Sequence, residues 1–341
     1  MSSRRTNLGL LAFFALALLT GALSFATGTE WVSVAVVAHG VTGLGVLVLS
    51  PWKSALIRRG LRRRPPRLRG QGLASLGSLA LTALVVVTLA AGLLHTAGVA
   101  RLGPLGAMQV HVGAALAALP LALWHVRVRP APLRPNDLSR RGLLRTGFVL
   151  GGAVMLWGTL EGLIAAASLP GADRRATGSH EVGSYDPPAM PVTQWLDDDV
   201  PRLDEAKWTL TVRLPRGERR WPLAELDTDL EVLVATLDCT GGWYAQQEWS
   251  VLPLRRVVGS AAGARSILVR SATGYTRRFP VIDLDRLWLA TRIGGAPLSP
   301  GHGFPVRIVA PGRRGFWWVK WVETIELSDR PWWWQSPFPL T

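Results

Sequence analysis

The chain has a single cysteine, Cys239, among 341 residues. Because a disulfide joins two thiols, no internal disulfide can form. The lone thiol is therefore a buried bystander, a reactive nucleophile or a ligand of a soft metal ion. The residues on either side of Cys239, from Leu237 to Trp243, favour the metal ligand.

Acidic residues are also scarce, with 23 Asp and Glu against 38 Lys and Arg, which gives a formal net charge of +15. A basic excess can indicate nucleic-acid binding. Here the arginines gather in short loops between apolar runs, where they act as topology signals, so we expect no nucleic-acid partner. The hydrophobic content of 48% and the mean hydropathy of +0.23 predict membrane segments.

Five runs have almost no charge, and each is close to the ~20 residues that cross a ~30 Å hydrocarbon layer. They are residues 7–28, 32–50, 72–94, 105–126 and 146–169. Arginine-rich loops follow the second and fourth runs, and Arg4 and Arg5 precede the first. The positive-inside rule places these basic segments in the cytoplasm and everything after the fifth run outside. We therefore predict an all-α bundle of five transmembrane helices over residues 1–170 of a multi-pass cell-membrane protein, with lipid as a partner.

An export signal is predicted just before the fifth run. Residues 139–145, Ser139-Arg140-Arg141-Gly142-Leu143-Leu144-Arg145, resemble the twin-arginine signal and precede an apolar stretch. Two adjacent arginines are also ordinary topology residues, but the serine and the two leucines favour the signal. This route carries folded domains, which suits a domain that receives a cofactor in the cytoplasm. We expect the fifth run to stay as an anchor.

The composition becomes polar beyond Pro170. Residues 171–184 predict a linker, and residues 185–341 predict one soluble domain of ordinary size. Its helical signals are short and open at Pro222 and Pro253. Runs rich in β-branched and aromatic residues predict strands at 208–212, 230–237, 266–270, 287–292 and 306–309. The exported domain is therefore expected to be a mixed α+β fold.

Four histidines lie in or at the ends of the predicted spans, where polar side chains are costly: His39, His95, His111 and His125. Each alone is more often a packing or interface residue than a ligand. His111 and His125 are 14 residues apart (125 − 111), so they share one helix face about 21 Å apart. This spacing resembles the helices of b-type cytochromes, which can place a haem toward each membrane surface.

Depth in the membrane selects the pair that could ligate one haem iron, because two axial ligands must lie at the same level. His39 and His111 both lie about 10 Å below the outer surface. His95, at the outer end of the third span, is an alternate ligand, and His125 near the cytoplasmic end has no partner at its depth. We expect one b haem on His39 and His111, with two haems or none as alternatives. Glu161 is either a proton carrier at a quinone site or, more commonly, a carboxylate hydrogen-bonded between helices.

Several ordered motifs in the C-terminal domain resemble one family. They are Thr236-Leu237-Asp238-Cys239-Thr240-Gly241-Gly242-Trp243, Gln247-Glu248-Trp249, Leu298-Ser299-Pro300-Gly301-His302-Gly303-Phe304-Pro305-Val306-Arg307 and Gly315-Phe316-Trp317-Trp318-Val319-Lys320-Trp321. Together they resemble the molybdopterin-binding domain of the sulfite oxidase family. The resemblance implies an oxidoreductase with a molybdenum-molybdopterin cofactor. It makes Cys239 the molybdenum ligand and implies cofactor binding by His302, Arg307, Lys320 and the loop Gly315-Phe316-Trp317.

Elementary chemistry agrees with these implied roles. A metal held by a pterin dithiolene needs one soft protein thiolate, and the domain has one cysteine. The pterin ends in a phosphate, for which Arg307 and Lys320 offer charge, His302 a hydrogen-bond donor and the glycine loop its amides. Each also has an ordinary alternative, such as a solvent-facing strand arginine, a loop cap or a surface lysine.

Two departures from sulfite oxidases shape the expected reaction. The chain ends soon after Leu327, which leaves no room for the family's immunoglobulin-like dimerisation domain, so we expect a monomer. The residues after Cys239 are not the arginines that hold sulfite; Trp243 and Tyr244 are expected to form an uncharged wall of the catalytic site. Arg277 and Arg278 could still reach it. A neutral or larger small molecule, such as a sulfoxide, is the expected substrate.

These expectations combine into one leading hypothesis. The chain is a membrane-anchored molybdenum oxidoreductase that exchanges electrons through a b haem with the quinone pool or a redox partner protein. One alternative is a hydrolase that uses Cys239 and His302 as nucleophile and base. The other is a haem-bearing electron-transfer or sensor protein with a degenerate soluble domain.

Overall fold

The computed structural model describes residues 3–62, 71–132, 134, 137, 139–194, 198–215 and 217–338. These residues form two compact units. Unit 1 comprises Met1–Phe25 and Glu30–His180, and unit 2 comprises Ala26–Thr29 and Glu181–Thr341. The boundary between the units therefore falls inside the predicted linker.

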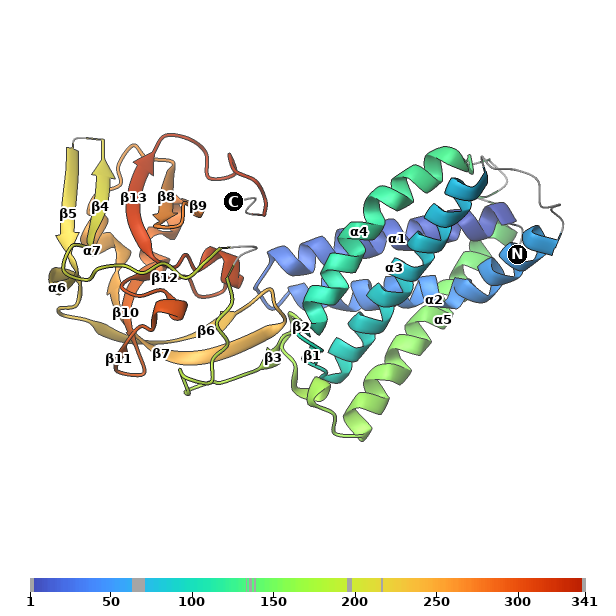
Figure 1. The fold of residues 1–341 in the computed structure, drawn as a ribbon, viewed down its shortest axis with the longest axis horizontal. Coiled ribbons are helices and arrows are strands. Elements are labelled where there is room, and N and C mark those ends of the chain that lie inside the picture. The colour runs from blue at the N-terminus through green and yellow to red at the C-terminus, as the bar shows by residue number, and fades with distance from the viewer. Residues whose placement is uncertain are drawn as a thin grey trace. The chain divides into compact units, whose positions relative to one another are not determined.

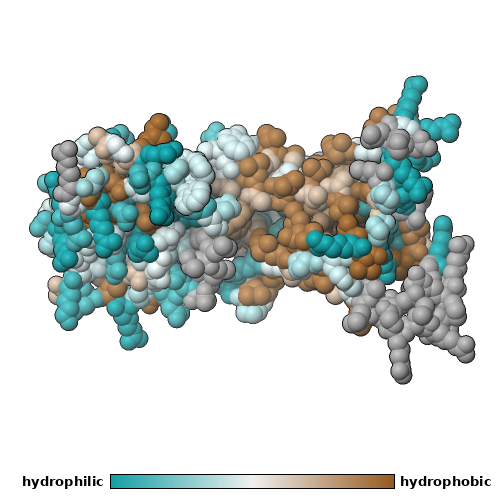
Figure 2. Space-filling view, turned by 90° about the horizontal axis from the view of Figure 1, so that it is seen from above, coloured by the Kyte–Doolittle hydropathy of each residue, from teal (hydrophilic) through white to brown (hydrophobic). Residues whose placement is uncertain are grey.

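Unit 1 is built from long helices (Figure 1). They are α1 (Ser3–Ala26), α2 (Val32–Arg62), α3 (Gln71–Ala97), α4 (Ala107–Val128) and α5 (Arg140–Ala166). In the described part of the chain these are five helices long and apolar enough to cross a membrane. Many of their apolar side chains point outward, and Phe148 is 81% exposed. Figure 2 shows this apolar surface in brown over unit 1 and a more hydrophilic surface over unit 2.

Two helices extend beyond the predicted apolar runs. α2 continues past residue 50 to Arg62, because lysine and arginine are good helix formers and need not end a helix. α5 begins at Arg140, so the two arginines of the export-like motif form its first turn. Before α4, the strands β1 (Arg101–Leu102) and β2 (Leu105–Gly106) form a short hairpin.

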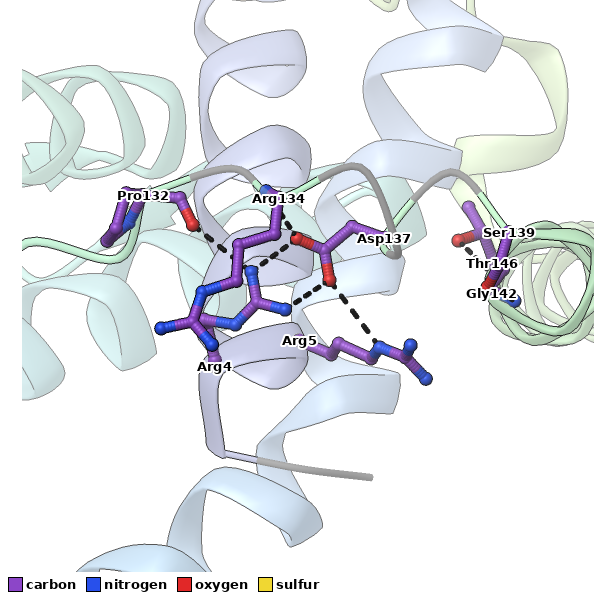
Figure 3. Close-up of polar contacts among 8 residues, drawn as sticks. All are labelled: Arg4, Arg5, Pro132, Arg134, Asp137, Ser139, Gly142 and Thr146. Carbon is purple, nitrogen blue, oxygen red and sulfur yellow. Dashed lines mark hydrogen bonds and ion pairs between the residues drawn. The ribbon is translucent and has the colours of Figure 1, made fainter.

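Ser139 and Asp137 fix the entry into α5 (Figure 3). The Ser139 hydroxyl accepts a hydrogen bond from the Gly142 amide at 3.3 Å and caps the helix. Asp137 forms ion pairs with Arg4, and with Arg5 at 3.6 Å. The basic N-terminus of α1 is therefore joined to the segment before α5, at the end of unit 1 where the predicted cytoplasmic charges gather.

The helices of unit 1 pack in pairs, α3 with α4 and α2 with α5. Phe13 of α1 is buried against Val46 and Leu49 of α2. This packing is close because Gly45 lies under the ring of Phe13, where a Cβ atom would come within 2.5 Å of it. The bundle interior is therefore made of small residues facing large ones.

Unit 2 contains two β-sheets in its described residues (Figure 1). The first consists of β3 (His180–Glu181), β6 (Glu231–Asp238), β7 (Trp243–Pro253), β10 (Trp288–Ile293), β11 (Ala296–Pro297) and β12 (Arg307–Val309). The second consists of β4 (Thr209–Leu214), β5 (Gly217–Pro222), β8 (Ser266–Ser271), β9 (Thr276–Pro280) and β13 (Val322–Ser328). Helices are short, as in α6 (Leu223–Leu226) and α7 (Leu254–Val258). The predicted α+β class is confirmed, and each predicted strand lies on an observed one.

The core of unit 2 follows the period of two that strands impose. On β7, Ala245, Gln247, Trp249 and Val251 are buried in alternation. β7 lies between β6 and β10 and is antiparallel to both. The turn of the hairpin that joins β6 to β7 carries Cys239.

Candidate functional site

The turn between β6 and β7 holds the Cys239 thiol in a defined direction. The Cys239 amide donates to Trp243 O at 2.8 Å, and the Gly242 amide donates back to Cys239 O at 3.2 Å. Gly242 has φ of 88°, a conformation that favours glycine. The Gly241 amide donates to the Cys239 sulfur at 3.3 Å. The Thr-Gly-Gly sequence therefore builds a turn whose backbone supports a sulfur ligand.

Burial raises the pKa of the Cys239 thiol, and the Gly241 amide and the Arg314 charge offset this only in part. A cysteine nucleophile needs a lowered pKa, so a free reactive thiolate does not suit this site. A metal ion, by contrast, deprotonates a coordinating thiol outright. The environment of Cys239 therefore fits a metal ligand better than a nucleophile.

A cavity opens beside Cys239 and gathers most of the predicted site residues. Those that line it are Cys239, Trp243, His302, Arg307, Gly315, Phe316 and Lys320. Tyr244 and Trp317 lie outside the lining. Neighbouring residues on a strand face opposite sides, so Tyr244 points away where Trp243 points in. The Trp317 ring instead packs 4.2 Å from the Arg277 guanidinium and 4.5 Å from that of Arg313.

Arg307 on β12 is a buried cation with no carboxylate partner among the described residues. It donates to His302 O at 2.9 Å and to Trp318 O at 3.3 Å, and its Nε atom has no partner. Its guanidinium lies 5.0 Å from the centre of the Trp249 ring. Burial lowers the pKa of Arg307 to about 9, so the side chain is still charged near neutral pH.

Lys320 adds a second, half-buried cation to the same cavity, whose lining also includes the carboxylate of Asp198. Its amino group donates to Gly301 O at 2.6 Å and to Thr193 O at 2.8 Å. Burial, followed by the nearby Arg307 charge, lowers the pKa of Lys320 to about 7. A buried charge is costly unless an opposite charge matches it. The cavity therefore has the chemistry of an anion site, and the phosphate of a pterin cofactor fits it.

His302 lines the cavity with both ring nitrogens hydrogen-bonded. Its Nε2 atom is 3.1 Å from Met190 O, which can only accept, so Nε2 carries the proton. Its Nδ1 atom is then free to accept from the Ser299 hydroxyl at 2.9 Å. Both ring nitrogens are engaged, so the ring is not placed as a general base for Cys239. This geometry disfavours the hydrolase alternative and gives His302 a bracing role in place of the predicted donor role.

Thr193 was not singled out from the sequence. Its hydroxyl accepts from Trp243 Nε1 at 3.1 Å and lies 3.9 Å from the Cys239 sulfur. Its carbonyl oxygen binds Lys320. Thr193 is 46 residues from Cys239 and has no motif around it, so no local signal could have placed it in the site.

Arg277 and Arg278 do not reach the cavity. Arg277 stacks on Phe316 and Trp317 and donates to Ser336 O at 3.3 Å. Arg278 donates to the Ser266 hydroxyl at 3.0 Å. Among the residues that line the cavity, Arg307 is the one arginine. The other charged residues in the lining are Asp198 and Lys320.

Unit 1 brings His39 and His111 together. Their Nε2 atoms are 3.4 Å apart and their rings are nearly perpendicular, at 85°. His39 Nδ1 lies 2.9 Å from Ala17 O and His111 Nδ1 lies 2.8 Å from Thr88 O. Carbonyl oxygens only accept, so both rings carry a proton on Nδ1 and turn the bare Nε2 lone pairs toward each other. Two lone pairs in this arrangement suit a metal ion between them.

Glycines give the two rings their space. A Cβ atom at Gly21 would lie 2.9 Å from the His39 ring, and one at Gly92 would lie 2.7 Å from the His111 ring. Two metal–imidazole bonds of about 2 Å each would need a nitrogen separation of about 4 Å. The observed spacing of 3.4 Å is shorter than this.

The remaining histidines of the predicted spans lie elsewhere in unit 1. His95 packs against His180, with ring centres 4.7 Å apart, and contacts Gly178 O at 3.1 Å. His125 contacts the Ser78 hydroxyl at 3.2 Å. Glu161 forms an ion pair with Arg174, which lies in the segment after α5 and not on a second spanning helix.

Comparison with known proteins identifies the domain in unit 2. Residues 197–335 match the family model described as oxidoreductase molybdopterin binding domain. The nitrate reductase (NADPH) of Mycosarcoma maydis is 50% identical over 50 residues, 14% of this chain and 5% of that protein. The nitrate reductase (NAD(P)H) of Hordeum vulgare is 27% identical over 168 residues, 38% of this chain and 19% of that protein. The chain thus spans less than a fifth of the length of these curated relatives.

Among solved structures, the sulfane dehydrogenase SoxCD from Paracoccus pantotrophus aligns with a TM-score of 0.36 and 22% identity, over 38% of this chain and 40% of that one. The family match rests on the sequence of residues 197–335. This part of unit 2 is therefore an oxidoreductase molybdopterin-binding domain. The resemblance predicted from the cysteine, arginine and lysine motifs is confirmed for this domain.

Proposed function

We propose that the protein is a membrane-anchored molybdenum-cofactor oxidoreductase. It acts on a small substrate outside the cytoplasmic membrane and exchanges electrons, through a b haem, with the quinone pool or a redox partner protein. The observation that carries the proposal is the cavity of unit 2, where the chain's one thiol, that of Cys239, shares the lining with the buried Arg307, with Lys320 and with a single described carboxylate, Asp198. The family match of residues 197–335 supports the same cofactor.

Each cavity residue has a defined task in this proposal. Cys239 ligates molybdenum, and Arg307 and Lys320 match the charge of the pterin phosphate. Gly315 allows its loop to approach the metal ligand, because a Cβ atom there would lie 3.1 Å from Cys239 Cα. Thr193 orients Trp243, whose indole excludes charge and water from the cavity wall. The molybdenum centre, when bound, supplies two-electron oxygen-atom chemistry.

The substrate class follows from the charge of the wall. A small dianion such as sulfite needs several charge-assisted hydrogen bonds to leave water. Arg307 and Lys320 are committed to backbone carbonyls and to the cofactor phosphate, and Arg277 and Arg278 lie outside the lining. A neutral substrate of the sulfoxide kind therefore fits better than sulfite.

The histidine pair of unit 1 supports the haem. His39 and His111 present bare Nε2 atoms to one point, and the carbonyls of Ala17 and Thr88 fix their tautomers. Hydrogen bonds of this kind orient metal-ligating imidazoles. The five apolar helices support a membrane location for this pair.

The test is metal and haem analysis of the protein purified from membranes in detergent. We expect molybdenum with pterin and a low-spin haem spectrum in the same preparation. Cys239→Ser should abolish turnover of a sulfoxide with a reduced dye as donor, while pterin remains bound in part through Arg307 and Lys320. A protein that lacks molybdenum but hydrolyses esters or amides through Cys239 would show the hydrolase alternative to be right, and a haem protein without molybdenum would favour the sensor alternative.

A further inference from the structure

Arg314 is a buried cation that none of the roles above uses. It is 3% exposed, although it follows the partly exposed Arg313 directly in the chain. One of its terminal nitrogens lies 2.5 Å from a carboxylate oxygen of Asp238, and both side chains of this ion pair are about 95% buried. Asp238 is the residue immediately before Cys239. A buried ion pair at this position therefore touches the turn that carries the sulfur.

The other end of the guanidinium holds Cys239 itself. The second terminal nitrogen donates to Cys239 O at 3.1 Å. The backbones of Asp238 and Arg314 also form a parallel β-bridge. The Arg314 side chain thus hydrogen-bonds to two successive residues of the turn, Asp238 and Cys239, although it lies 75 positions after Cys239 in the chain. Because the guanidinium is planar, it fixes the orientation of these two residues as well as their distance.

The loop of Arg314 packs against the turn that carries Cys239. Gly315 approaches so closely that a Cβ atom would lie 3.1 Å from Cys239 Cα and 3.5 Å from Asp238 O. Arg314 is not among the residues that line the cavity. It therefore acts on substrate or cofactor indirectly, through the Cys239 turn that it contacts.

We propose that Arg314 is a positioning residue that fixes the Cys239 thiolate as a molybdenum ligand. It holds the turn through its bonds to Asp238 and Cys239 O. Its positive charge near the sulfur would lower the electron donation from the thiolate to the metal. The inference rests on the proposed function. Groups outside the ligand sphere orient ligands in this way, and their loss typically costs about 10–100-fold in activity or metal affinity.

Arg313 provides a matched control in the next position. It also forms an ion pair, with Asp283, and also lies over the Trp317 ring, at 4.5 Å. No contact joins it to Cys239 in the described structure. Arg313→Gln therefore removes one positive charge from the same loop and leaves the contacts of Arg314 with Asp238 and Cys239 in place.

The experiment compares Arg314→Gln, Arg314→Lys and Arg313→Gln in the full-length protein purified in detergent. Molybdenum content is measured first, and every other quantity is expressed per molybdenum. The Mo(V) electron paramagnetic resonance spectrum is recorded on partial reduction with dithionite. Turnover is measured with dimethyl sulfoxide as the probe and a reduced viologen as electron donor.

Arg314→Gln is expected to change the Mo(V) g-values and to lower kcat per molybdenum roughly 10–100-fold, with KM within about twofold of the original. The KM should hold because Arg314 does not line the cavity. Arg314→Lys should fall between the two, because lysine keeps the charge but not the fork. Arg313→Gln should match the unmodified protein.

An unchanged Mo(V) spectrum in Arg314→Gln, or an equal change in Arg313→Gln, overturns the inference. If Arg314→Gln does not fold, Asp238→Asn takes its place under the same criteria. This substitution removes the carboxylate charge that pairs with Arg314 and hardly changes the shape of the side chain. Absence of molybdenum from the unmodified protein would instead refute the proposed function, so the two failures are distinguishable.

Discussion

Replacing Lys320 by methionine tests the central claim that the cavity holds cations awaiting an anion. The Lys320 pKa is lowered to about 7 from its ordinary 10.5, first by burial and then by the Arg307 charge. Between these two values the unfolded chain binds more protons at Lys320 than the folded protein does. The free energy of unfolding of the cofactor-free protein should therefore rise as the pH rises through this range.

The size of the effect follows from the same pKa. Between pH 7 and pH 9, deprotonation of one such lysine adds about 2 kcal/mol to the free energy of unfolding. The neutral amine keeps two N–H donors, so its bonds to Thr193 O and Gly301 O survive. Lys320→Met removes the titrating group, and the difference in stability between the original protein and the variant should change by this amount.

Cofactor-free protein from a host that makes no molybdopterin is unfolded with denaturant at pH 7 and at pH 9, in detergent, and followed by tryptophan fluorescence. Lys207→Met is the matched control, because the Lys207 side chain is 86% exposed. Its pH profile should run parallel to that of the original protein. Parallel profiles for Lys320→Met as well would refute the argument.

Further outcomes concern the membrane unit and the substrate. His39→Ala should abolish the low-spin haem spectrum, whereas His125→Ala should leave it, because the His125 ring contacts the Ser78 hydroxyl and not His39 or His111 in the described structure. Loss of haem in His125→Ala alone would contradict the assignment. Replacement of Arg140 and Arg141 by lysine should keep a reporter fused after unit 2 inside the cell, and an exported reporter would argue against the twin-arginine route. In steady-state assays a sulfoxide should be turned over well and sulfite poorly; a sulfite kcat/KM near ~10⁶ M⁻¹s⁻¹ would reverse the substrate proposal.

Lys320→Met should also weaken the binding of the cofactor. Loss of one charge-assisted hydrogen bond to the phosphate should cost about 1.5–3 kcal/mol, or roughly 10–150-fold in cofactor affinity. Molybdenum retained after dialysis measures this loss. Retention equal to that of Lys207→Met would contradict a phosphate-binding role for Lys320.

The helices of unit 1 and the strands of unit 2 were predictable because each depends on short-range properties. A charge-free run near 20 residues has few alternatives to a helix, and β-branched runs bounded by turns favour strands. Helix ends were less accurate, since α2 continues through Lys53 and Arg58 to Arg62. Charge marks where a span leaves the apolar layer, but it does not end a helix.

The histidine pair shows how far simple geometry can reach. Counting residues from the span ends places His39 and His111 at the same depth, and the structure puts their Nε2 atoms 3.4 Å apart. The same count could not show that His95 faces His180, because His180 lies outside the spans and its position depends on the path of the chain after α5.

For the cavity, the sequence alone determined which chemistry is present. One thiol, a strand arginine and a lysine lie in ordered motifs that resemble a molybdopterin-binding domain, and these groups suit soft-metal ligation and phosphate binding. Only the tertiary structure decided which side chains line the cavity. Trp243 faces the cavity and Tyr244 does not, because the pleat of β7 alternates. Thr193 and Arg314 reach Cys239 across 46 and 75 positions, a proximity that folding creates and that no local pattern encodes.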